Sequence, residues 1–513
     1  MKSRHVAAAA LLAATVLFAG AAPARAHGGP VAATDHGAVR GLTADGVDKF
    51  LGIPYAAPPV GALRWRAPQP AARWHGVRDA TSLPPRCPQA TNSNGPRSED
   101  EDCLYLSVYR PRGFAFHLPV LFWIHGGGLT TGSGTQHDGA LIARTDHVVV
   151  VSINYRLGAL GFLALPGIGA GNFGLMDQRA ALRWTASNIR GFGGDPRNVT
   201  IAGESAGGFS VCAILAAPSM RGMFSRAVMQ SGSCPSQTLA AAQKSGAAFA
   251  AGLGCSDAAC LRAKPVGALL DATPQPAASF TVDGDLLPLA PADAIAGGHF
   301  TRVPTLFGSN RNEGRTFSQG FAGFTQAQYE GFVRSTEGAR ADAVLQRYPW
   351  SAYPSPYTAA YAIGDIWTDS GFAAGIGGCT AQTLAQRFAD STRTYAYEFD
   401  DPNAPHLNNS LPGYQWGSGH AMELAYMWPS FDNGIPLYPQ LTPAQLELSR
   451  QMVRYWGAFA WLGAPWVPGQ PRWPEYSSGR MLSLRPGGHT TPITDAQYSA
   501  EHMCAFWDQG SSM

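Results

Sequence analysis

One serine in this chain stands in a setting typical of an enzymatic nucleophile. Ser205 is the central residue of Gly203-Glu-Ser-Ala-Gly207, which follows the β-branched run 199–201 and precedes helix-favouring residues. This strand–turn–helix order indicates a sharp turn that would hold the serine Oγ clear of its own backbone. Glycines flank the serine because side chains there would clash with the neighbouring strand and helix. The pattern arises by chance about 0.5 times in a chain of this composition, so an ordinary serine in a surface loop remains the alternative interpretation.

A glycine run supplies a second element of the same chemistry. His125-Gly-Gly-Gly128 follows the apolar stretch 121–124. Three successive glycines cost conformational entropy, so an ordinary loop would make poor use of them. Their bare N–H groups can point at the negative charge that develops on an attacked carbonyl oxygen. We expect such an oxyanion hole to use Gly127, Gly128 and, directly after the nucleophile, Ala206, with a tight structural turn as the alternative.

A nucleophilic serine needs a general base, and the base needs an acid that orients it. In enzymes with a serine on such a turn the chain order is serine, acid, histidine, which disfavours histidines before Ser205. His420 lies in a glycine turn at 417–420, and Glu313 lies just past a predicted strand. Order alone leaves competitors open: the histidines His299, His406, His489 and His502, and the acids Asp283, Asp285, Asp365 and Asp369.

The elements that must position these residues can be read from hydrophobic patterns. Short apolar runs rich in β-branched and aromatic residues predict buried strands. The runs are Val120–Ile124, Val148–Ile153, Val199–Ala202, Ala227–Gln230, Val303–Gly308 and Tyr395–Phe399. Helical patterns such as Leu175–Ile189 and Gly208–Leu215 alternate with them. We therefore expect an α/β fold with a mostly parallel sheet covered on both faces, and a site at the carboxyl ends of its strands.

The amino terminus predicts an exported protein. Lys2 and Arg4 precede the apolar stretch Val6–Ala19, and Ala24-Arg-Ala26 supplies a cleavage pattern. Residues 1–26 are thus expected to be a cleaved signal peptide. An uncleaved anchor is the alternative, but the stretch is shorter than the about 20 residues that span a bilayer. We expect the mature protein to be secreted and without stable membrane insertion.

The bulk composition narrows the class of partner. The net charge of the 513-residue chain is +2, and 14% of its residues are charged. This balance argues against nucleic acid as a partner. We found no metal-ligand cluster or phosphate-binding loop in the sequence, so no cofactor or metal is expected. Eight cysteines on an exported chain predict disulfides, although spacing alone does not give their connectivity.

Further motifs resemble the type-B carboxylesterase and cholinesterase family, including bacterial secreted carboxylesterases of the para-nitrobenzyl-esterase type. In chain order they are Phe50-Leu-Gly-Ile-Pro-Tyr-Ala56 with Leu63-Arg-Trp65, Glu101-Asp-Cys-Leu-Tyr-Leu106, Asn154-Tyr-Arg-Leu-Gly158, Gly171-Asn-Phe-Gly-Leu-Met-Asp-Gln178, Gly203–Gly208 and Gln230-Ser-Gly232. The loops around Glu313 and His420 resemble the family's Asn-x-x-Glu-Gly and His-x-x-Glu-Leu. The resemblance implies an α/β-hydrolase fold with a large, mostly parallel central sheet, formed by one domain over residues 27–513.

The resemblance also implies a catalytic role for each residue of a triad. Ser205 would attack an ester carbonyl, His420 would take its proton and return it to the leaving alcohol, and Glu313 would orient the imidazole. Water would then cleave the acyl-enzyme. Glu204 and Ser231 resemble positions that support the histidine, with local hydrogen bonding as the alternative for both.

Disulfide pairing follows from the resemblance as well. Cys87–Cys103 and Cys255–Cys260 match the family's first two disulfide loops, and Cys379 with Cys504 resembles the long-range disulfide of the cholinesterase branch. For Cys212 and Cys234 we expect buried thiols, with a fourth disulfide as the alternative.

One departure from the family bears on the substrate. In cholinesterases the first disulfide loop carries a tryptophan that holds a quaternary ammonium group by cation–π contact. Residues 88–102 contain no tryptophan, so choline esters are not the expected substrate. Aromatic residues considered for a substrate pocket, with a core role as the alternative for each, are Phe280, Phe317, Tyr353, Tyr357, Trp367, Phe372 and Tyr426.

We expect a serine carboxylesterase that hydrolyses small or medium uncharged esters as a monomer or weak oligomer. A triacylglycerol lipase is one alternative and would need an amphipathic lid. A non-catalytic cholinesterase-like adhesion protein is a second alternative, which is disfavoured because such proteins typically lose the serine.

Overall fold

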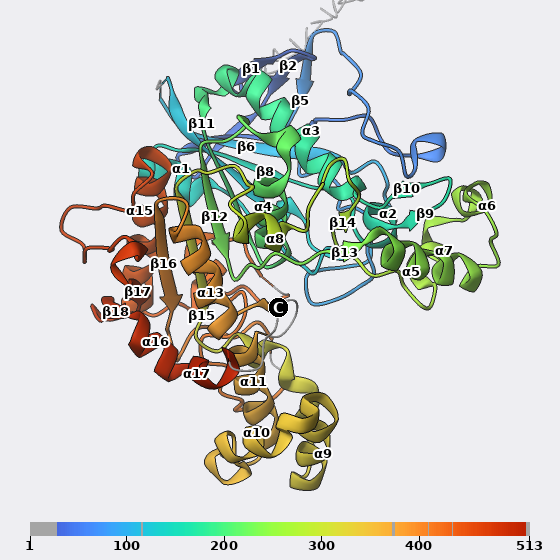
Figure 1. Cartoon of the computed structure of the whole chain (residues 1–513). Helices are drawn as coiled ribbons and strands as arrows, with labels where there is room; N and C mark the ends of the chain where they lie inside the picture. Colours follow the sequence, from blue (N-terminus) through green and yellow to red (C-terminus); the bar gives the residue numbers. More distant parts are fainter. Residues whose placement is uncertain (1–27, 114–115, 372–374, 409, 433, 509–513) are drawn as a thin grey trace, which may run out of the picture.

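The computed structural model describes residues 28–113, 116–371, 375–408, 410–432 and 434–508, so the predicted signal peptide lies outside the described residues. At its centre is an 11-stranded sheet with the strand order β18-β17-β16-β15-β12-β11-β7-β8-β6-β4-β3 (Figure 1). These strands are β3 (Leu42–Ala44), β4 (Val47–Pro54), β6 (Tyr105–Pro111), β7 (Leu118–Ile124), β8 (Val149–Ile153), β11 (Gly194–Glu204), β12 (Arg226–Gln230), β15 (Thr305–Asn310), β16 (Thr394–Phe399), β17 (Arg480–Leu484) and β18 (Thr491–Thr494).

The middle of the sheet is parallel and its edges are antiparallel. Every neighbouring pair from β8 to β17 is parallel, whereas β17–β18, β8–β6, β6–β4 and β4–β3 are antiparallel. A separate three-stranded sheet contains β1 (Val31–Thr34), β2 (Gly37–Arg40) and β5 (Val77–Asp79). The prediction of an α/β fold with a large, mostly parallel sheet is confirmed, and all six predicted strands belong to it.

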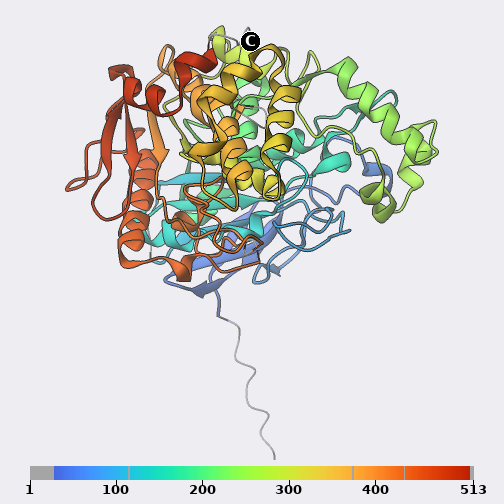
Figure 2. The same cartoon turned by 90° about the horizontal axis from the view of Figure 1, so that it is seen from below.

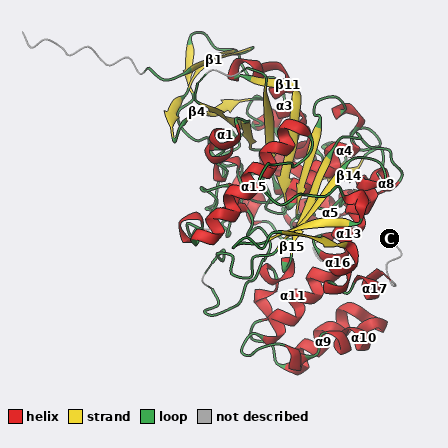
Figure 3. Cartoon of the chain, turned by 90° about the vertical axis from the view of Figure 1, so that its left-hand side faces the viewer, coloured by secondary structure: helices red, strands yellow, loops and turns green. Residues whose placement is uncertain are grey.

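Helices cover both faces of this sheet. On one face, α3 and α4 share a core with alternate strand residues such as Phe122 and Val151. On the other face, α1 and α15 share a core with the intervening residues of the same strands, such as Trp123 and Val150. Helix α15 lies across the strands (Figure 3). Because both faces are covered, the central strands read as continuous apolar runs. The covering helices are α1 (Ala140–Asp146), α3 (Phe173–Asn188), α4 (Ala206–Ala216), α8 (Pro291–Ala296), α13 (Gly378–Ala389) and α15 (Pro443–Leu462).

Further helices surround this core. In Figure 1 the arrowheads of β12 and β16 point toward the side on which α9, α10 and α11 lie. Helices α5, α6 and α7 lie at the opposite side of the molecule from β17 and β18 (Figures 1 and 2). The helices that surround the core are α2 (Gly158–Phe162), α5 (Leu239–Gly252), α6 (Ala258–Ala263), α7 (Val266–Asp271), α9 (Gln326–Glu337), α10 (Ala341–Arg347), α11 (Thr358–Ser370), α14 (Leu424–Met427), α16 (Asp495–Glu501) and α17 (Cys504–Trp507). No helix of the described residues is long and apolar enough to cross a membrane.

Four disulfides join segments around this framework. They are Cys87–Cys103, Cys212–Cys234, Cys255–Cys260 and Cys379–Cys504. The expectation of buried thiols at Cys212 and Cys234 is therefore wrong, and the alternative of a fourth disulfide holds. Helix α4 packs on β12 so closely that a Cβ on Gly208 would lie 2.8 Å from Gly232 Cα. This approach brings the two cysteine Cα atoms to 5.4 Å, which is within bonding range.

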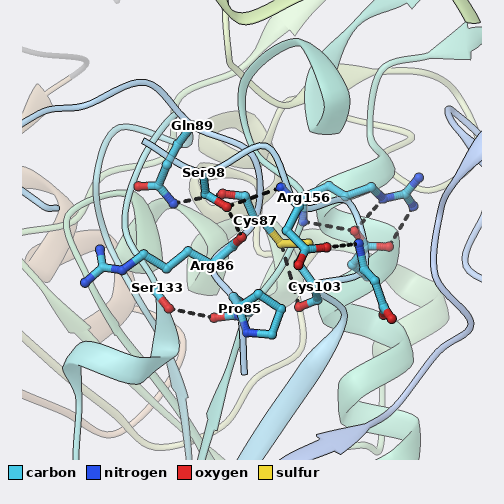
Figure 4. Close-up of a disulfide and its surroundings, with 12 residues drawn as sticks. Pro85, Arg86, Cys87, Gln89, Ser98, Cys103, Ser133 and Arg156 are labelled. Atoms are coloured by element: carbon cyan, nitrogen blue, oxygen red, sulfur yellow. Dashed lines mark hydrogen bonds and ion pairs between the residues drawn. A yellow bond between two sulfur atoms is a disulfide. The ribbon is translucent and has the colours of Figure 1, made fainter. Parts of the chain in front are cut away.

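The first disulfide braces the glycine run. Figure 4 shows Gln89 beside the Cys87–Cys103 disulfide. The Gln89 amide donates to the carbonyl oxygens of Cys87 at 3.0 Å and Gly132 at 2.9 Å, and it accepts from the Gly132 N–H at 2.9 Å. The short loop is thus fixed to the segment that directly follows the glycine run.

Candidate active site

Ser205 lies on a strained turn between β11 and α4. Its φ of 55° and ψ of −122° are unusual for a residue with a side chain. A Cβ on Gly207 would collide with the Ile124 carbonyl oxygen, and one on Gly203 would collide with the Gly207 backbone. The Ser205 N–H donates to the Gln230 carbonyl oxygen at 2.9 Å, which fixes the turn to β12. The glycine spacing that singled out this serine is therefore a steric requirement of the turn.

The glycine run lies beside this turn. Gly127 and Gly128 have φ angles of 102° and 62°, which favour glycine. A Cβ on Gly126 would lie 2.7 Å from a Glu204 carboxylate oxygen. Among the described residues, the N–H groups of Gly127, Gly128 and Ala206 have no hydrogen-bond acceptor, and Ala206 is the first residue of α4, where the helix supplies none. These donors are available to an oxyanion.

Glu313 and His420 meet although 107 residues separate them. Glu313 follows β15, and its carboxylate accepts from the Asn310 N–H at 2.7 Å. Its other oxygen lies 2.6 Å from His420 Nδ1. Because the carboxylate accepts, Nδ1 carries the proton and Nε2 faces the other way. The carboxylate thus sets both the tautomer and the orientation of the imidazole.

A second carboxylate faces the other nitrogen of the same imidazole. His420 Nε2 lies 3.2 Å from Glu204 Oε1, whereas Ser205 Oγ makes no hydrogen bond to any described residue. Burial opposes the charged imidazole, but the carboxylates of Glu204 and Glu313 outweigh burial and raise the pKa of His420. Burial also raises the pKa of Glu204, supported by the nearby charges of Glu423 and Glu313 and opposed by His420. Both His420 and Glu204 therefore keep their protons to a higher pH than the same side chains would in water.

Sequence reasoning did not single out the buried polar network behind these residues. Glu423 is fully buried and accepts from the Asn310 amide at 2.7 Å and the Gln230 amide at 3.2 Å. The side-chain amide oxygen of Gln230 accepts from the Trp456 indole at 2.9 Å. Burial, with the charge of Glu313, raises the pKa of Glu423. The glutamate of the His-x-x-Glu-Leu motif was the signal that could have found this network.

Ser205 and His420 line one cavity of about 340 Å³. The glycine run and Glu204 form part of its wall. Neutral polar side chains also line it, namely Ser93, Asn94, His125, Gln136, His137, Thr316, Gln319 and Asn408. The apolar side chains are Phe209, Phe317, Ile376, Leu407, Ala421, Leu424 and Phe431. The described part of the wall has no lysine or arginine and no tryptophan.

The competing histidines lie elsewhere. His299 and His489 are exposed, and His406 lies beside the ring of Trp416. His502 is buried and bridges two carboxylates, with Nδ1 2.7 Å from Asp369 and Nε2 2.8 Å from Glu398. Burial opposes its charge, but the hydrogen bonds to Asp369 and Glu398 outweigh burial and raise the pKa of His502 to about 10.

The competing acids also have other partners. Asp283 accepts from the Asn172 amide, Asp365 pairs with Arg315, and Asp285 is exposed. None of them lines the cavity, as described, that holds Ser205.

The other residues predicted for the site are Ser231 and a set of aromatic residues. Ser231 is buried, and its hydroxyl has no hydrogen-bond partner among the described residues, so no contact with the histidine supports it there. Of the aromatic residues considered for a pocket, Phe317 lines the cavity and its ring lies 4.9 Å from that of His420. Phe372 lies outside the described residues. The remaining ones, Phe280, Tyr353, Tyr357, Trp367 and Tyr426, pack in the apolar core clusters and do not line the cavity as described.

Within the described residues, no group of three or more His, Cys, Asp or Glu side chains is arranged to hold a metal ion.

The chain is similar to known esterases over most of its length. A sequence model of the Carboxylesterase family matches residues 28–507. The chain is 35% identical to an acetylcholinesterase of Bungarus fasciatus, over 93% of this chain and 85% of that protein. It is 35% identical to the para-nitrobenzyl esterase of Bacillus subtilis strain 168, over 87% and 92%. It is 33% identical to the fumonisin B1 esterase of Sphingopyxis macrogoltabida, over 86% and 84%. Each of these relatives bears the name of an esterase.

Proposed function

We propose that Ser205, Glu313 and His420 form the catalytic triad of this protein. The premise is that the chain belongs to the carboxylesterase family and is a carboxylic ester hydrolase. The observation that carries the proposal is the 2.6 Å contact between Glu313 and His420 Nδ1, at a cavity that Ser205 also lines. The tautomer that this contact imposes leaves Nε2 able to accept the serine proton.

The reaction follows from these positions. Ser205 Oγ attacks the ester carbonyl carbon while His420 Nε2 takes its proton, and the N–H groups of Gly127, Gly128 and Ala206 stabilise the oxyanion. The imidazolium then protonates the leaving alcohol, and an acyl-enzyme remains on Ser205. Water, deprotonated by the same imidazole, attacks the acyl-enzyme and releases the acid.

Glu204 has a supporting role in this scheme. Its carboxylate lies on the Nε2 side of the imidazole and stabilises the imidazolium that forms when the serine proton is transferred. The Ser205 hydroxyl makes no hydrogen bond to the described residues, so it is free to turn toward Nε2 when substrate binds. The same carboxylate resists deprotonation of the imidazole, so the enzyme works best at the alkaline side of neutrality.

The cavity supports small or medium uncharged esters as substrates. Its volume of about 340 Å³ is within the range of small-molecule sites. Its described wall has no tryptophan to receive a quaternary ammonium group, which disfavours choline esters despite the similarity to an acetylcholinesterase. We further propose that the protein is secreted, as a single domain over residues 27–513 and as a monomer or weak oligomer. The amino-terminal sequence and the four disulfides support an exported protein.

The test compares Ser205→Ala with wild type on short p-nitrophenyl esters. The variant should lose several orders of magnitude in kcat and should no longer react with a fluorophosphonate probe. Ser219→Ala, which removes an exposed hydroxyl after α4, is the matched control and should keep both activities. Near-normal hydrolysis by Ser205→Ala would refute the triad. Faster turnover of emulsified long-chain triglyceride than of short esters would favour a lipase instead.

A further inference from the structure

A buried glutamine that does not line the cavity, as described, is bonded to the loop that follows the glycine run. Gln89 is 1% exposed, and Figure 4 shows it beside the Cys87–Cys103 disulfide. Its N–H donates to the Ser98 carbonyl oxygen at 3.0 Å, within the same disulfide loop. Its side-chain amide donates to the Gly132 carbonyl oxygen at 2.9 Å and accepts from the Gly132 N–H at 2.9 Å. The amide therefore holds the Gly132 backbone in both directions.

Gly132 lies against the first peptide groups of the glycine run. A Cβ on Gly132 would lie 2.6 Å from both the Gly126 carbonyl oxygen and His125 Nδ1. His125 Nδ1 lies 2.8 Å from that carbonyl oxygen, which only accepts, so Nδ1 carries the proton and donates. The Gly126 carbonyl belongs to the peptide group that ends in the Gly127 N–H. Because C=O and N–H point in opposite directions in a trans peptide, the Gly127 N–H points away from His125.

The residue before Gly132 fixes the next peptide group in the same way. The N–H and the hydroxyl of Thr131 donate to the Gly127 carbonyl oxygen at 3.0 and 3.1 Å. This carbonyl belongs to the peptide group that ends in the Gly128 N–H, which therefore points away from Thr131. The Thr131 hydroxyl also accepts from the Asn94 amide at 2.9 Å. Two side chains of the disulfide loop, Gln89 and Asn94, thus hold the segment that orients both N–H groups.

The glycine run cannot hold this orientation by itself. Glycine populates a wider range of backbone angles than other residues, so three in succession depend on neighbouring groups for one conformation. An oxyanion donor is effective when it is oriented before the charge develops. Removal of one such donor typically lowers kcat by about 100- to 1000-fold, and a displacement of about 1 Å can cost about 100-fold. A residue that fixes the run can therefore act on catalysis without contact to the substrate.

We propose that Gln89 is a positioning residue of the oxyanion hole. Its amide fixes Gly132, and Gly132 and Thr131 fix the peptide groups that present the N–H groups of Gly127 and Gly128. This inference rests on the proposed function, because it assigns a support to the oxyanion donors named there. Gln89 makes no contact with Ser205 or His420 and takes no part in bond making or breaking.

An ester and its thiono analogue separate the oxyanion hole from the rest of the site. The two substrates are p-nitrophenyl butyrate and the same ester with sulfur in place of the carbonyl oxygen. Sulfur is a weaker hydrogen-bond acceptor and has a longer bond to carbon, so a well-positioned oxyanion hole favours the oxygen ester. The oxygen preference is the kcat/KM ratio of the oxygen ester to the sulfur ester, divided by the ratio of their alkaline hydrolysis rates. The fraction of folded protein cancels in this preference.

Gln89→Met keeps the length of the side chain but removes its hydrogen bonds to Gly132. It should lower kcat on the oxygen ester about tenfold with little change in KM, and it should lower the oxygen preference about tenfold. Thr131→Val removes one donor to the Gly127 carbonyl and should lower the preference less, whereas Thr131→Ser keeps the hydroxyl and should retain the wild-type value.

Two control variants should retain the wild-type oxygen preference. Glu313→Gln impairs the proposed base and not the hole, so it should slow both esters alike. Gln69→Met changes an exposed glutamine outside the cavity and should leave both rates unchanged.

The outcomes separate this inference from the function on which it rests. An oxygen preference in wild type that falls in Gln89→Met and in Thr131→Val supports it. An unchanged preference in Gln89→Met overturns it, even where kcat falls, because the residue then only stabilises the fold. If Gln89→Met yields no folded protein, the preference of Thr131→Val decides, and an unchanged value overturns the inference. A wild type without any oxygen preference refutes the proposed oxyanion hole and this role of Gln89 together.

Discussion

The Glu204 carboxylate should set the pH at which the enzyme becomes active. A full charge 3.2 Å from His420 Nε2 attracts the imidazolium by about 5 kcal/mol at an effective dielectric constant of about 20. Burial cancels most of this attraction, and the raised pKa of Glu204 means that its own charge is incomplete near neutral pH. An opposite charge at this distance typically shifts a pKa by one to three units.

The direction of the effect follows from the role of the imidazole. In the proposed triad His420 must be neutral to take the serine proton, and its pKa is raised, so kcat/KM should rise with pH as the imidazolium is lost. Glu204→Gln removes the charge and should move this acid limb to lower pH by about one to two units. The assay is kcat/KM against pH on an ester that does not itself titrate. Glu204→Asp, which keeps the charge, should move the limb less.

The position of the limb matters here, and not the height of the plateau. A glutamine amide can donate to Nε2 and lower kcat for reasons unrelated to charge. Glu501→Gln removes an exposed carboxylate outside the cavity and should leave the limb in place. The electrostatic reasoning is refuted if the limb of Glu204→Gln stays where it is in wild type or moves to higher pH.

Three further predictions concern the acid, the buried histidine bridge and the long disulfide. Glu313→Gln should lower kcat by about three orders of magnitude with a much smaller change in KM, because the imidazole loses its tautomer and orientation; a loss below tenfold in steady-state kinetics would contradict that role. His502→Gln should lower the free energy of unfolding by about 3 kcal/mol in urea at pH 6, since it removes the cation beside buried Asp369 and leaves buried Glu398 with Arg311 at 3.6 Å. The pKa of His502 is raised to about 10, so its stabilisation is complete below about 6.5 and lost as the pH rises through 10; a gap between wild type and variant that widens at high pH would contradict the assignment. Cys504→Ser opens a loop of 125 residues and should cost up to about 5 kcal/mol relative to the oxidised wild type, with both proteins unfolded in urea without reductant.

The fold was predictable because its central strands are buried on both faces. Their continuous apolar runs mark β7 and β8 directly in the sequence. The edge strands β3 and β18 were not predicted, since they are short and carry exposed or half-exposed residues. Each pairs only with the strand next to it along the chain, β3 with β4 and β18 with β17, so neither is held between two strands as the buried central strands are.

The disulfide between Cys212 and Cys234 illustrates the same limit. Each cysteine taken alone reads as a buried thiol. Their pairing depends on the close contact between α4 and the segment after β12, where two glycines face each other. That contact is a property of tertiary packing and has no signature at either cysteine.

The residues of the candidate site also fall into two groups, those that local sequence features indicate and those that only the tertiary fold brings together. A serine on a glycine-flanked turn and a glycine run after a strand are local features, since sterics at each position demand those residues. The approach of Glu313 to His420 follows only from the sheet. Glu313 lies in the loop after β15 and His420 lies in the segment after β16, and the sheet places these two strands side by side. Residue order restricted the proposed general base to the histidines after Ser205, but it did not give the protonation of either ring nitrogen. In His420 the carboxylate of Glu313 lies at Nδ1 and fixes the tautomer, and the carboxylate of Glu204 faces Nε2. A sequence gives the identity of a histidine, whereas its acceptor or donor character is decided by the neighbours that the fold brings to each nitrogen.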